Sequence, residues 1–309
     1  MIAHPDLPAT LRVFVRDWLC ANHVLCFGRH ENVLIDAGHV TRVDETLSLL
    51  KPALDGRPLH RLLNTHCHSD HMGGNAAIRR AFGCRVEIPA GEADAIRSWD
   101  TDALWLDYAG QQAERFTFDD VLTVGQRLEL GERDWDVLAA PGHDMGAVMF
   151  WCATERILIS GDALWEHGFG IVLPGPGWRE RLAAARDTLL SIRALAPEVV
   201  IPGHGAPFAG AGSAIERCLS RIAAFEGDEA RLARHVLRVM LVYSLLERDG
   251  VPAGDAVSTF ADIPMFRDYA RSYFDAPAGE IVGRLLDELT KSGHATIADG
   301  RVTAGGAAG

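Results

Sequence analysis

The chain has 309 residues, 48 % of them hydrophobic, which is enough for a sizeable core in one large domain or in a large and a small one. Its net charge of −12 counts against nucleic acid as the main substrate, because an acidic protein repels phosphate backbones at long range. No apolar run approaches the ~20 residues that span a membrane and no signal peptide is recognisable, so we expect a cytoplasmic protein without membrane contact.

Short apolar runs separated by turn residues predict a strand-rich first part of the chain. The first 40 residues favour antiparallel strands, with Gly28–His30 as a hairpin turn. A helix from about Val40 to Leu50 is expected to end at Pro52, because proline cannot continue the hydrogen bonding of a helix. We expect strands at 11–15, 23–27, 32–35, 59–63, 84–88, 135–139, 157–159 and 199–201, and helices at 75–82 and 178–195.

The pattern becomes helical from about residue 209. We expect helices at 213–225, 230–247, 265–274 and 279–292. Residues 295–303 predict a hairpin with a type I′ turn at Asp299-Gly300, and residues 304–309 are expected to be disordered. The sequence therefore predicts two domains, residues 1–208 and residues 209–309.

The residues that carry chemistry are concentrated in Thr-His-Cys-His-Ser-Asp-His-Met-Gly-Gly-Asn at positions 65–75. This run contains four potential metal ligands within six residues, namely His66, His68, Asp70 and His71. Imidazoles and carboxylates are the ligands that suit zinc and similar first-row metals. The run follows an apolar strand-like stretch and precedes a helical pattern, so it is predicted to be a metal-binding loop. Cys67 lies between the ligands and is expected to be a small packed thiol.

Three isolated polar residues supply further candidate ligands. His143 lies in Ala-Pro-Gly-His-Asp, Asp162 in Ile-Ser-Gly-Asp-Ala, and His204 in Ile-Pro-Gly-His-Gly. Each follows a short apolar run and stands next to a glycine, so each is expected on a loop at the end of a strand. Binding residues are commonly carried on loops that a rigid scaffold positions.

Together these pieces resemble the metallo-β-lactamase superfamily, over roughly residues 10–208. The resemblance implies an αββα sandwich, that is, an α+β fold of four layers with the metals at one edge between the sheets. It also implies the following ligand set: His66, His68 and His143 for a first metal ion, Asp70, His71 and His204 for a second, and Asp162 bridging both. Asp36, in Val-Leu-Ile-Asp-Ala-Gly, matches an aspartate that supports the site in this family, and a turn residue before Gly38 is the alternative interpretation.

Within this family the loop sequence is especially like that of glyoxalase II. The β-lactamases proper match poorly, because their zinc-binding cysteine normally occupies the place of Asp162. The last ligand here stands in Pro-Gly-His-Gly, unlike the Cys-Gly-His-Glu-Tyr run of glyoxalase II, and the glutathione-binding pattern of those enzymes is not recognisable. The helices and hairpin of residues 209–309 resemble a winged-helix-like extension found on some members. Those residues hold 11 Lys plus Arg against 14 Asp plus Glu, so packing or homodimer formation is expected there in place of nucleic-acid binding.

The predicted ligand set indicates hydrolysis. Two cations can share a bridging hydroxide and polarise a carbonyl or phosphoryl oxygen. We expect Asp162 and Asp70 to be catalytic, the first by holding the metals together and the second by orienting the hydroxide. The cofactors are expected to be two divalent metal ions, zinc in the first place and manganese or iron as alternatives. The expected substrate is a small thioester, ester or lactone.

Three other functions stay open from the sequence. They are a phosphodiesterase or ribonuclease, which a basic groove beside the metals would favour, a persulfide dioxygenase with one iron, and a regulatory protein without turnover. The loops at 97–125 and 163–178 are expected to shape the substrate entrance. His167 and Tyr108 are candidates for substrate contact there, and an exposed loop histidine and a core aromatic are the respective alternatives.

Overall fold

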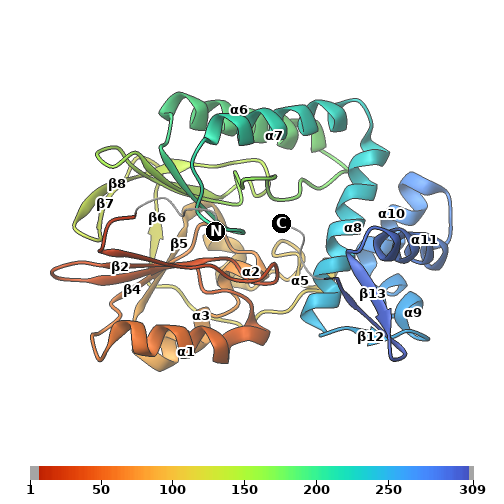
Figure 1. The fold of residues 1–309 in the computed structure, drawn as a ribbon, viewed down its shortest axis with the longest axis horizontal. Helices are drawn as coiled ribbons and strands as arrows, with labels where there is room; N and C mark the ends of the chain where they lie inside the picture. Colours follow the sequence, from red (N-terminus) through yellow and green to blue (C-terminus); the bar gives the residue numbers. More distant parts are fainter. Residues whose placement is uncertain (1–6, 306–309) are drawn as a thin grey trace.

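The computed structural model describes residues 7–305 (Figure 1), and residues 1–6 and 306–309 lie outside that description. The disorder expected for 304–309 therefore falls mostly on residues that are not described. Ala304 itself ends a strand, so the expectation was wrong for that residue.

Two sheets form the centre of the first 208 residues. One has six strands in the order β1 (Leu11–Phe14), β2 (His23–Phe27), β3 (Asn32–Ile35), β4 (Arg61–Leu63), β5 (Arg85–Pro89) and β6 (Asp120–Leu122). The other has five strands in the order β11 (Val199–Pro202), β10 (Ile157–Gly161), β9 (Val148–Cys152), β8 (Arg133–Ala139) and β7 (Arg127–Leu130). A third, small sheet is formed by β12 (Val251–Pro252), β14 (Arg301–Ala304) and β13 (Ala295–Ala298).

Helices cover the outer face of each large sheet (Figure 1). On the six-stranded sheet these are α1 (Val43–Leu54) and α3 (Asn75–Phe82), and on the five-stranded sheet α6 (Trp178–Leu195) and α7 (Ala211–Glu226). Short helical segments stand in the connections: η1 (Val40–Arg42), α2 (Ser69–Met72), η2 (Ala90–Glu92), α4 (Ala93–Ser98) and α5 (Leu106–Ala109).

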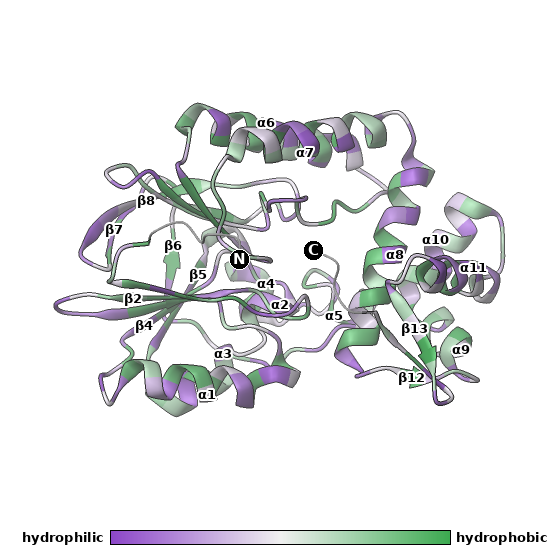
Figure 2. Cartoon of the chain, in the orientation of Figure 1, coloured by the Kyte–Doolittle hydropathy of each residue, from purple (hydrophilic) through white to green (hydrophobic). Residues whose placement is uncertain are grey.

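The alternation of side chains along the strands explains the four layers. In β2, Leu25 points to the core under α1, whereas Val24 joins the core between the sheets. In β9, Phe150 joins the core between the sheets and Trp151 points to the core under the helices. Because both faces of β9 are buried, its sequence Val-Met-Phe-Trp-Cys is apolar throughout. Figure 2 shows mostly hydrophobic residues in the middle of the sandwich and hydrophilic residues on the outer strands β7 and β8. The expected αββα sandwich is confirmed.

The C-terminal part is helical, as expected. It continues with α8 (Glu229–Glu247), α9 (Ala256–Ala261), α10 (Pro264–Phe274) and α11 (Ala278–Lys291), followed by the β13–β14 hairpin. Asp299 and Gly300 have φ of 50° and 72°, which confirms the type I′ turn. One hydrophobic cluster runs from the five-stranded sheet through α7 and α8 to α11 without a break. None of the helices in residues 7–305 has the length and apolar character that a membrane crossing requires.

Two details differ from the sequence prediction. The expected stop at Pro52 was wrong, because α1 continues to Leu54 and ends at Asp55, whose φ is 49°. Ala53 and Leu54 are buried, and their packing holds the last turn in place despite the hydrogen bond that proline removes. The short elements were not predicted, because six residues or fewer give too little periodicity to recognise; these are α2, α4, α5, α9, β6 and β12.

Strand direction decides where the loops with candidate ligands meet. In the six-stranded sheet β3, β4, β5 and β6 run parallel. In the other sheet β8, β10 and β11 point the same way, because β9 is antiparallel to both β8 and β10 while β10 is parallel to β11. The carboxyl ends of β8, β10 and β11 are therefore at one edge of their sheet, and the three loops with isolated candidate ligands start there.

Candidate metal centre

The structure brings all seven predicted ligands together at one edge of the sandwich. The 64–71 segment follows β4, His143 follows β8, Asp162 follows β10 and His204 follows β11. Two groups result, each with one ligand atom per residue and with those atoms within 4.8 Å of one another. The first group is His66, His68 and His143, and the second is Asp70, His71, Asp162 and His204.

The carboxylate of Asp162 stands between the two groups. Its Oδ2 lies 3.5 Å from His143 Nε2, on the side of the first group. Its Oδ1 lies 3.2 Å from His71 Nε2 and 3.7 Å from His204 Nε2, on the side of the second group. Each oxygen of one carboxylate therefore faces a different donor group.

Two imidazoles are oriented by hydrogen bonds on the nitrogen that faces away from the centre. His143 Nδ1 lies 2.5 Å from the carbonyl oxygen of Ile171, and since a carbonyl only accepts, Nδ1 carries the proton and Nε2 keeps a lone pair. His71 Nδ1 lies 2.8 Å from Asp36 Oδ2 in the same manner. This arrangement presents Nε2 of both residues to the centre.

Unpaired nitrogen atoms show that the site fits a cation. His66 Nε2 and His71 Nε2 are buried and have no hydrogen-bond partner among the described residues. A buried polar atom without a partner costs about 1–3 kcal/mol. Nitrogen lone pairs and carboxylate oxygens that converge in this way are a donor set for a divalent first-row metal.

The pKa values of several side chains in the centre differ strongly from their usual values. Burial, together with the neighbouring His71 and His68, holds the pKa of His66 well below its usual value, so that imidazole is neutral and able to donate a lone pair. Burial alone would raise the pKa of Asp162, but the adjacent His71 and His204 lower it to about 2. The pKa of Asp70 is likewise lowered by His71 and His204 against the effect of burial. Both aspartates are therefore carboxylates at neutral pH.

Asp36 supports the metal-binding loop. One of its oxygens accepts the Thr65 backbone N–H at 2.9 Å, and the other accepts the Thr65 hydroxyl at 2.9 Å and His71 Nδ1 at 2.8 Å. Its backbone has a φ of 59°, in the left-handed region that favours glycine. A residue held in that conformation by three hydrogen bonds does more than form a turn, so the alternative interpretation of Asp36 was wrong.

Three tryptophans flank the donor imidazoles. Trp105 stacks on His68 with ring centroids 4.3 Å apart, and Trp18 stacks on His204 at 5.5 Å. Trp165 contacts His204 edge-on and donates from Nε1 to Asp162 Oδ1 at 3.2 Å. Trp18 was not singled out in the sequence, because it lies far before the histidine that it covers.

His167 and Tyr108, the two candidates for substrate contact, are not among the seven residues of the two donor groups. The side chain of His167 is 63 % exposed, and its nearest charged partner is the adjacent Glu166 at 3.8 Å. Tyr108 is half-buried and packs against the hydrophobic cluster of the C-terminal helices. Contact of either residue with substrate stays a prediction. Cys67 is buried in the core under α1, as expected.

A pair of carboxyl groups behind His68 was not predicted. Asp144 Oδ2 lies 3.7 Å from His68 Nε2, and Asp144 also hydrogen-bonds with Glu92. Burial and the Asp144 charge raise the pKa of Glu92 to about 9, so Glu92 is protonated at neutral pH and donates to Asp144. Asp144 directly follows His143 in the sequence, and this position could have indicated that Asp144 lies near the centre. Nothing in the sequence around Glu92 indicates that it lies there.

Helix α8 reaches the metal-binding loop from the C-terminal part. The Tyr243 hydroxyl lies 3.1 Å from the hydroxyl of Ser69, which stands between two candidate ligands. Ser69 also donates to Gln111 at 3.0 Å. Four residues further along α8, Glu247 lies 3.4 Å from His39 Nε2, and both of these side chains are fully buried.

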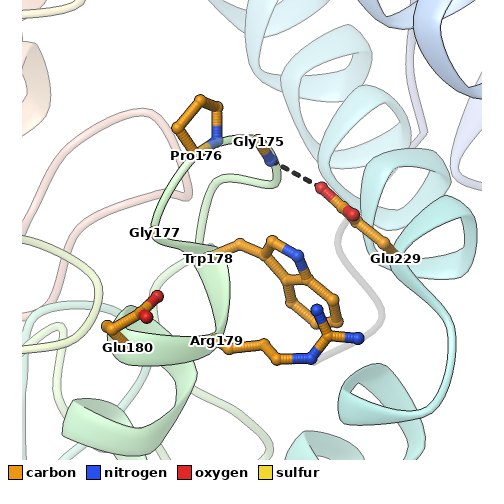
Figure 3. A pocket seen from close by; sticks show the side chains of 7 residues that line it. All are labelled: Gly175, Pro176, Gly177, Trp178, Arg179, Glu180 and Glu229. Atoms are coloured by element: carbon orange, nitrogen blue, oxygen red, sulfur yellow. Dashed lines mark hydrogen bonds between the residues drawn. The ribbon is translucent and has the colours of Figure 1, made fainter.

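The loop that follows Asp162 is fastened to the same helix (Figure 3). The Gly175 N–H donates to Glu229 Oε1 at 2.8 Å, and the Tyr273 hydroxyl donates to the same oxygen at 2.9 Å. Gly175, Pro176 and Trp178 line a hollow of about 450 Å³ there, into which none of the seven candidate ligands projects.

Comparison with known proteins agrees with this arrangement. The sequence pattern of the metallo-beta-lactamase superfamily matches residues 18–204. A hydroxyacylglutathione hydrolase of Rhodospirillum rubrum is 30 % identical over 163 residues, which are 51 % of this chain and 54 % of that protein. The protein of the same name from Methylococcus capsulatus is 34 % identical over 139 residues, 43 % of this chain and 47 % of that protein. The chain thus spans about half the length of these relatives.

Solved structures extend the likeness to the C-terminal helices. A metallo-beta-lactamase family protein from Thermus thermophilus has a TM-score of 0.59 at 20 % identity, over 97 % of this chain and 100 % of that one. A beta-lactamase domain protein from Burkholderia ambifaria has a TM-score of 0.55 at 20 % identity, over 97 % and 96 %. These identities show the fold alone. Because the superfamily pattern covers more than half of the sequence, the chain belongs to the metallo-beta-lactamase superfamily.

Proposed function

We propose that this protein is a dinuclear metal-dependent hydrolase of small acyl substrates, a thioester, an ester or a lactone. The observation that carries the proposal is the position of Asp162, whose two carboxylate oxygens face two separate groups of donors. Bound divalent ions, zinc in the first place, would supply a water molecule that is ionised near neutral pH and a Lewis acid for the carbonyl oxygen of the substrate.

The residues of the chain have distinct roles in this proposal. His66, His68 and His143 would hold one ion, Asp70, His71 and His204 the other, and Asp162 both. Asp36 and the Ile171 carbonyl fix the rings of His71 and His143, so that these do not reorient when substrate binds. We assign to Asp70 the orientation of the attacking water, because its Oδ2 faces His204 at 3.1 Å and its other oxygen has no partner among the described residues.

The tryptophans around the centre favour an acyl substrate. The rings of Trp18, Trp105 and Trp165 lie against His204 and His68 and reduce the access of bulk water to the donors. Electrostatic stabilisation of a developing oxyanion is stronger where water is excluded. The relatives named hydroxyacylglutathione hydrolase support a thioester within this class, although the chain spans only about half their length.

A second candidate, phosphodiester cleavage, is favoured by one observation. Five arginines line a hollow between α7 and α8, and two of them contact the loop that begins at Asp162. The net charge of −12 acts against a long nucleic acid at this surface.

A matched substrate panel tests the proposal. The metal-loaded protein and an Asp162→Ala variant would be assayed with a glutathione thioester, a coenzyme A thioester, a lactone, a simple ester and a phosphodiester. We expect metal-dependent turnover of acyl substrates only, and none by the variant. Phosphodiester cleavage without acyl turnover would overturn the proposal. Oxygen uptake with a persulfide and one iron per chain would indicate a dioxygenase, and no turnover at all would indicate a regulatory protein.

A further inference from the structure

The hollow between α7 and α8 is strongly basic, although the whole chain is acidic. It has a volume of about 880 Å³ and is lined by Glu216, Arg217, Ser220, Arg221, Ala224, Phe225, Arg231, Arg234, His235 and Arg238. We call it the arginine groove. Arg217 and Arg221 are four positions apart on α7, and Arg231, Arg234 and Arg238 follow at intervals of three and four on α8. Helical spacing therefore places the arginines of each helix on one face.

Most of this positive charge is not neutralised by the protein. Arg234 pairs with Glu288, but the other four arginines form no ion pair among residues 7–305. Arg231 and Arg238 also make no side-chain hydrogen bond within the described residues. Burial together with the adjacent Arg221 and Arg238 lowers the pKa of His235 to about 4, so this imidazole is neutral and the positive charge of the groove comes from its arginines.

The nearby acidic residues are engaged elsewhere. Glu216, the one acidic residue that lines the groove, pairs with Arg193 on α6. Glu226 pairs with Arg186, also on α6. Asp228 caps α8 by accepting the Arg231 backbone N–H at 3.0 Å. The four unpaired guanidinium groups therefore face the groove without compensation, in a place where an anion would be stabilised.

One short loop connects the arginine groove to the metal centre. Arg217 donates to the carbonyl oxygen of Glu166, and Arg221 donates to that of His167 at 3.2 Å. The loop that carries these carbonyls begins at Asp162 and includes Trp165, which donates to the Asp162 carboxylate. The same loop thus contacts the groove through two backbone carbonyls and the candidate metal centre through Trp165.

The size and charge of the groove select the class of ligand. Its volume is within the range of small-molecule pockets, about 300–1,000 Å³. Arginine forks bind both phosphate and carboxylate. Glutathione has two carboxylates but also an ammonium group, which four unpaired guanidinium groups would repel. A nucleotide with a diphosphate and a further phosphate offers several negative charges and no cation.

We infer that the arginine groove binds the phosphate groups of a small polyphosphorylated ligand, namely the nucleotide end of an acyl thioester that the metal centre hydrolyses. The second half of this inference rests on the proposed function.

Binding is tested separately from turnover. Adenosine 3′,5′-bisphosphate, which has no thiol to bind a metal, would be titrated calorimetrically into the full metal-loaded chain, with glutathione, pyrophosphate and a short single-stranded RNA as parallel ligands. The test variant is Arg231→Gln/Arg238→Gln, because these side chains make no hydrogen bond or ion pair within the described residues. Its matched control is Arg12→Gln/Arg267→Gln, which removes the same charge from exposed residues outside the groove.

We expect the test variant to weaken binding of the bisphosphate at least ~10-fold, since two charge-assisted contacts are lost, and the control to change it less than ~2-fold. Equal weakening in both variants, unchanged binding in the test variant, or tighter binding of glutathione or RNA than of the bisphosphate would overturn the inference.

Kinetics then test the link to the metal centre. The test variant should raise KM for a coenzyme A thioester at least ~10-fold with unchanged kcat, and leave KM for the corresponding N-acetylcysteamine thioester, which has no phosphate, as in the parent. Equal KM changes for both thioesters would overturn the link. Bisphosphate binding that depends on the arginines in a protein without thioester turnover would establish the groove as a phosphate site and overturn the proposed function alone.

Discussion

The hydroxyl of Tyr243 lies 3.1 Å from the hydroxyl of Ser69, so a helix of the C-terminal part touches the loop with four candidate metal ligands. Ser69 stands directly between His68 and Asp70. The C-terminal helices are therefore part of the environment of the candidate metal centre and not only an addition to its surface. This relationship gives the first of four predictions.

Replacing Tyr243 by Phe should impair turnover as well as stability. The variant loses one buried hydrogen bond, which is worth about 1 kcal/mol of unfolding free energy. Tyr273→Phe is the matched control, because it also loses one tyrosine hydrogen bond, to Glu229, away from the metal-binding loop. We expect similar losses in urea denaturation for both variants and a lower kcat for Tyr243→Phe alone. Equal kcat in the two variants would show that the contact with Ser69 is only structural.

Asp70→Ala should lose both a metal ion and activity. Asp70 is one of four donors in the second group, and we assign to it the orientation of water. We expect metal content, measured by inductively coupled plasma mass spectrometry, to fall from two ions per chain towards one. Turnover should drop by about 10²–10⁴-fold, the usual contribution of a positioned acid or base. A variant that keeps two ions and the parent's rate would refute both assignments.

Asp36→Asn should weaken metal binding without unfolding the protein. The amide keeps the size of the side chain and one acceptor oxygen, but its NH₂ group cannot accept the hydrogen bonds of the Thr65 hydroxyl and His71 Nδ1, which share one oxygen of Asp36. Loss of such a supporting partner weakens metal affinity by about 10–100-fold. Competition with a chromophoric chelator measures the change, and Asp134→Asn, at an exposed position on β8, provides the comparison. Indistinguishable affinities would mean that Asp36 does not orient the ligands.

Glu92→Gln should stabilise the metal-free protein at alkaline pH. Burial and the charge of Asp144 raise the pKa of Glu92 from 4.5 to about 9. The stability that this group contributes is therefore fully present below pH 4.5 and is lost as the pH rises towards 9. Glutamine keeps a donor for Asp144 and does not ionise. Calorimetry should show a higher Tm than the parent at pH 8 and a difference that shrinks towards pH 5. Parallel Tm curves for the two proteins would contradict this assignment.

The parts of the centre that are local in sequence could be predicted. His66, His68, Asp70 and His71 stand within six residues on one loop, so their spacing alone brings them together. The isolated ligands could be placed because each follows a short apolar strand, and strands that point the same way end at one edge.

Contacts between distant segments could not be predicted. The stacking of Trp18 on His204 and the pairing of Glu92 with Asp144 depend on how separate loops fold back on the sheets. The arginines of α7 and α8 have a visible helical spacing, but whether two such faces meet depends on the angle between the helices. The wrong stop at Pro52 has a related cause, because the burial of Leu54 outweighs a local preference.

The three hydrogen bonds that Asp36 accepts also determine when the metal-binding loop becomes ordered. Because the protein's own contacts hold Thr65 and His71, the conformational entropy of this loop is lost when the chain folds and not when an ion binds. A zinc finger, by contrast, folds only around its metal. An ion bound at this candidate centre would therefore exchange without refolding of the chain, and the supply of metals, more than the fold, would select among zinc, manganese and iron.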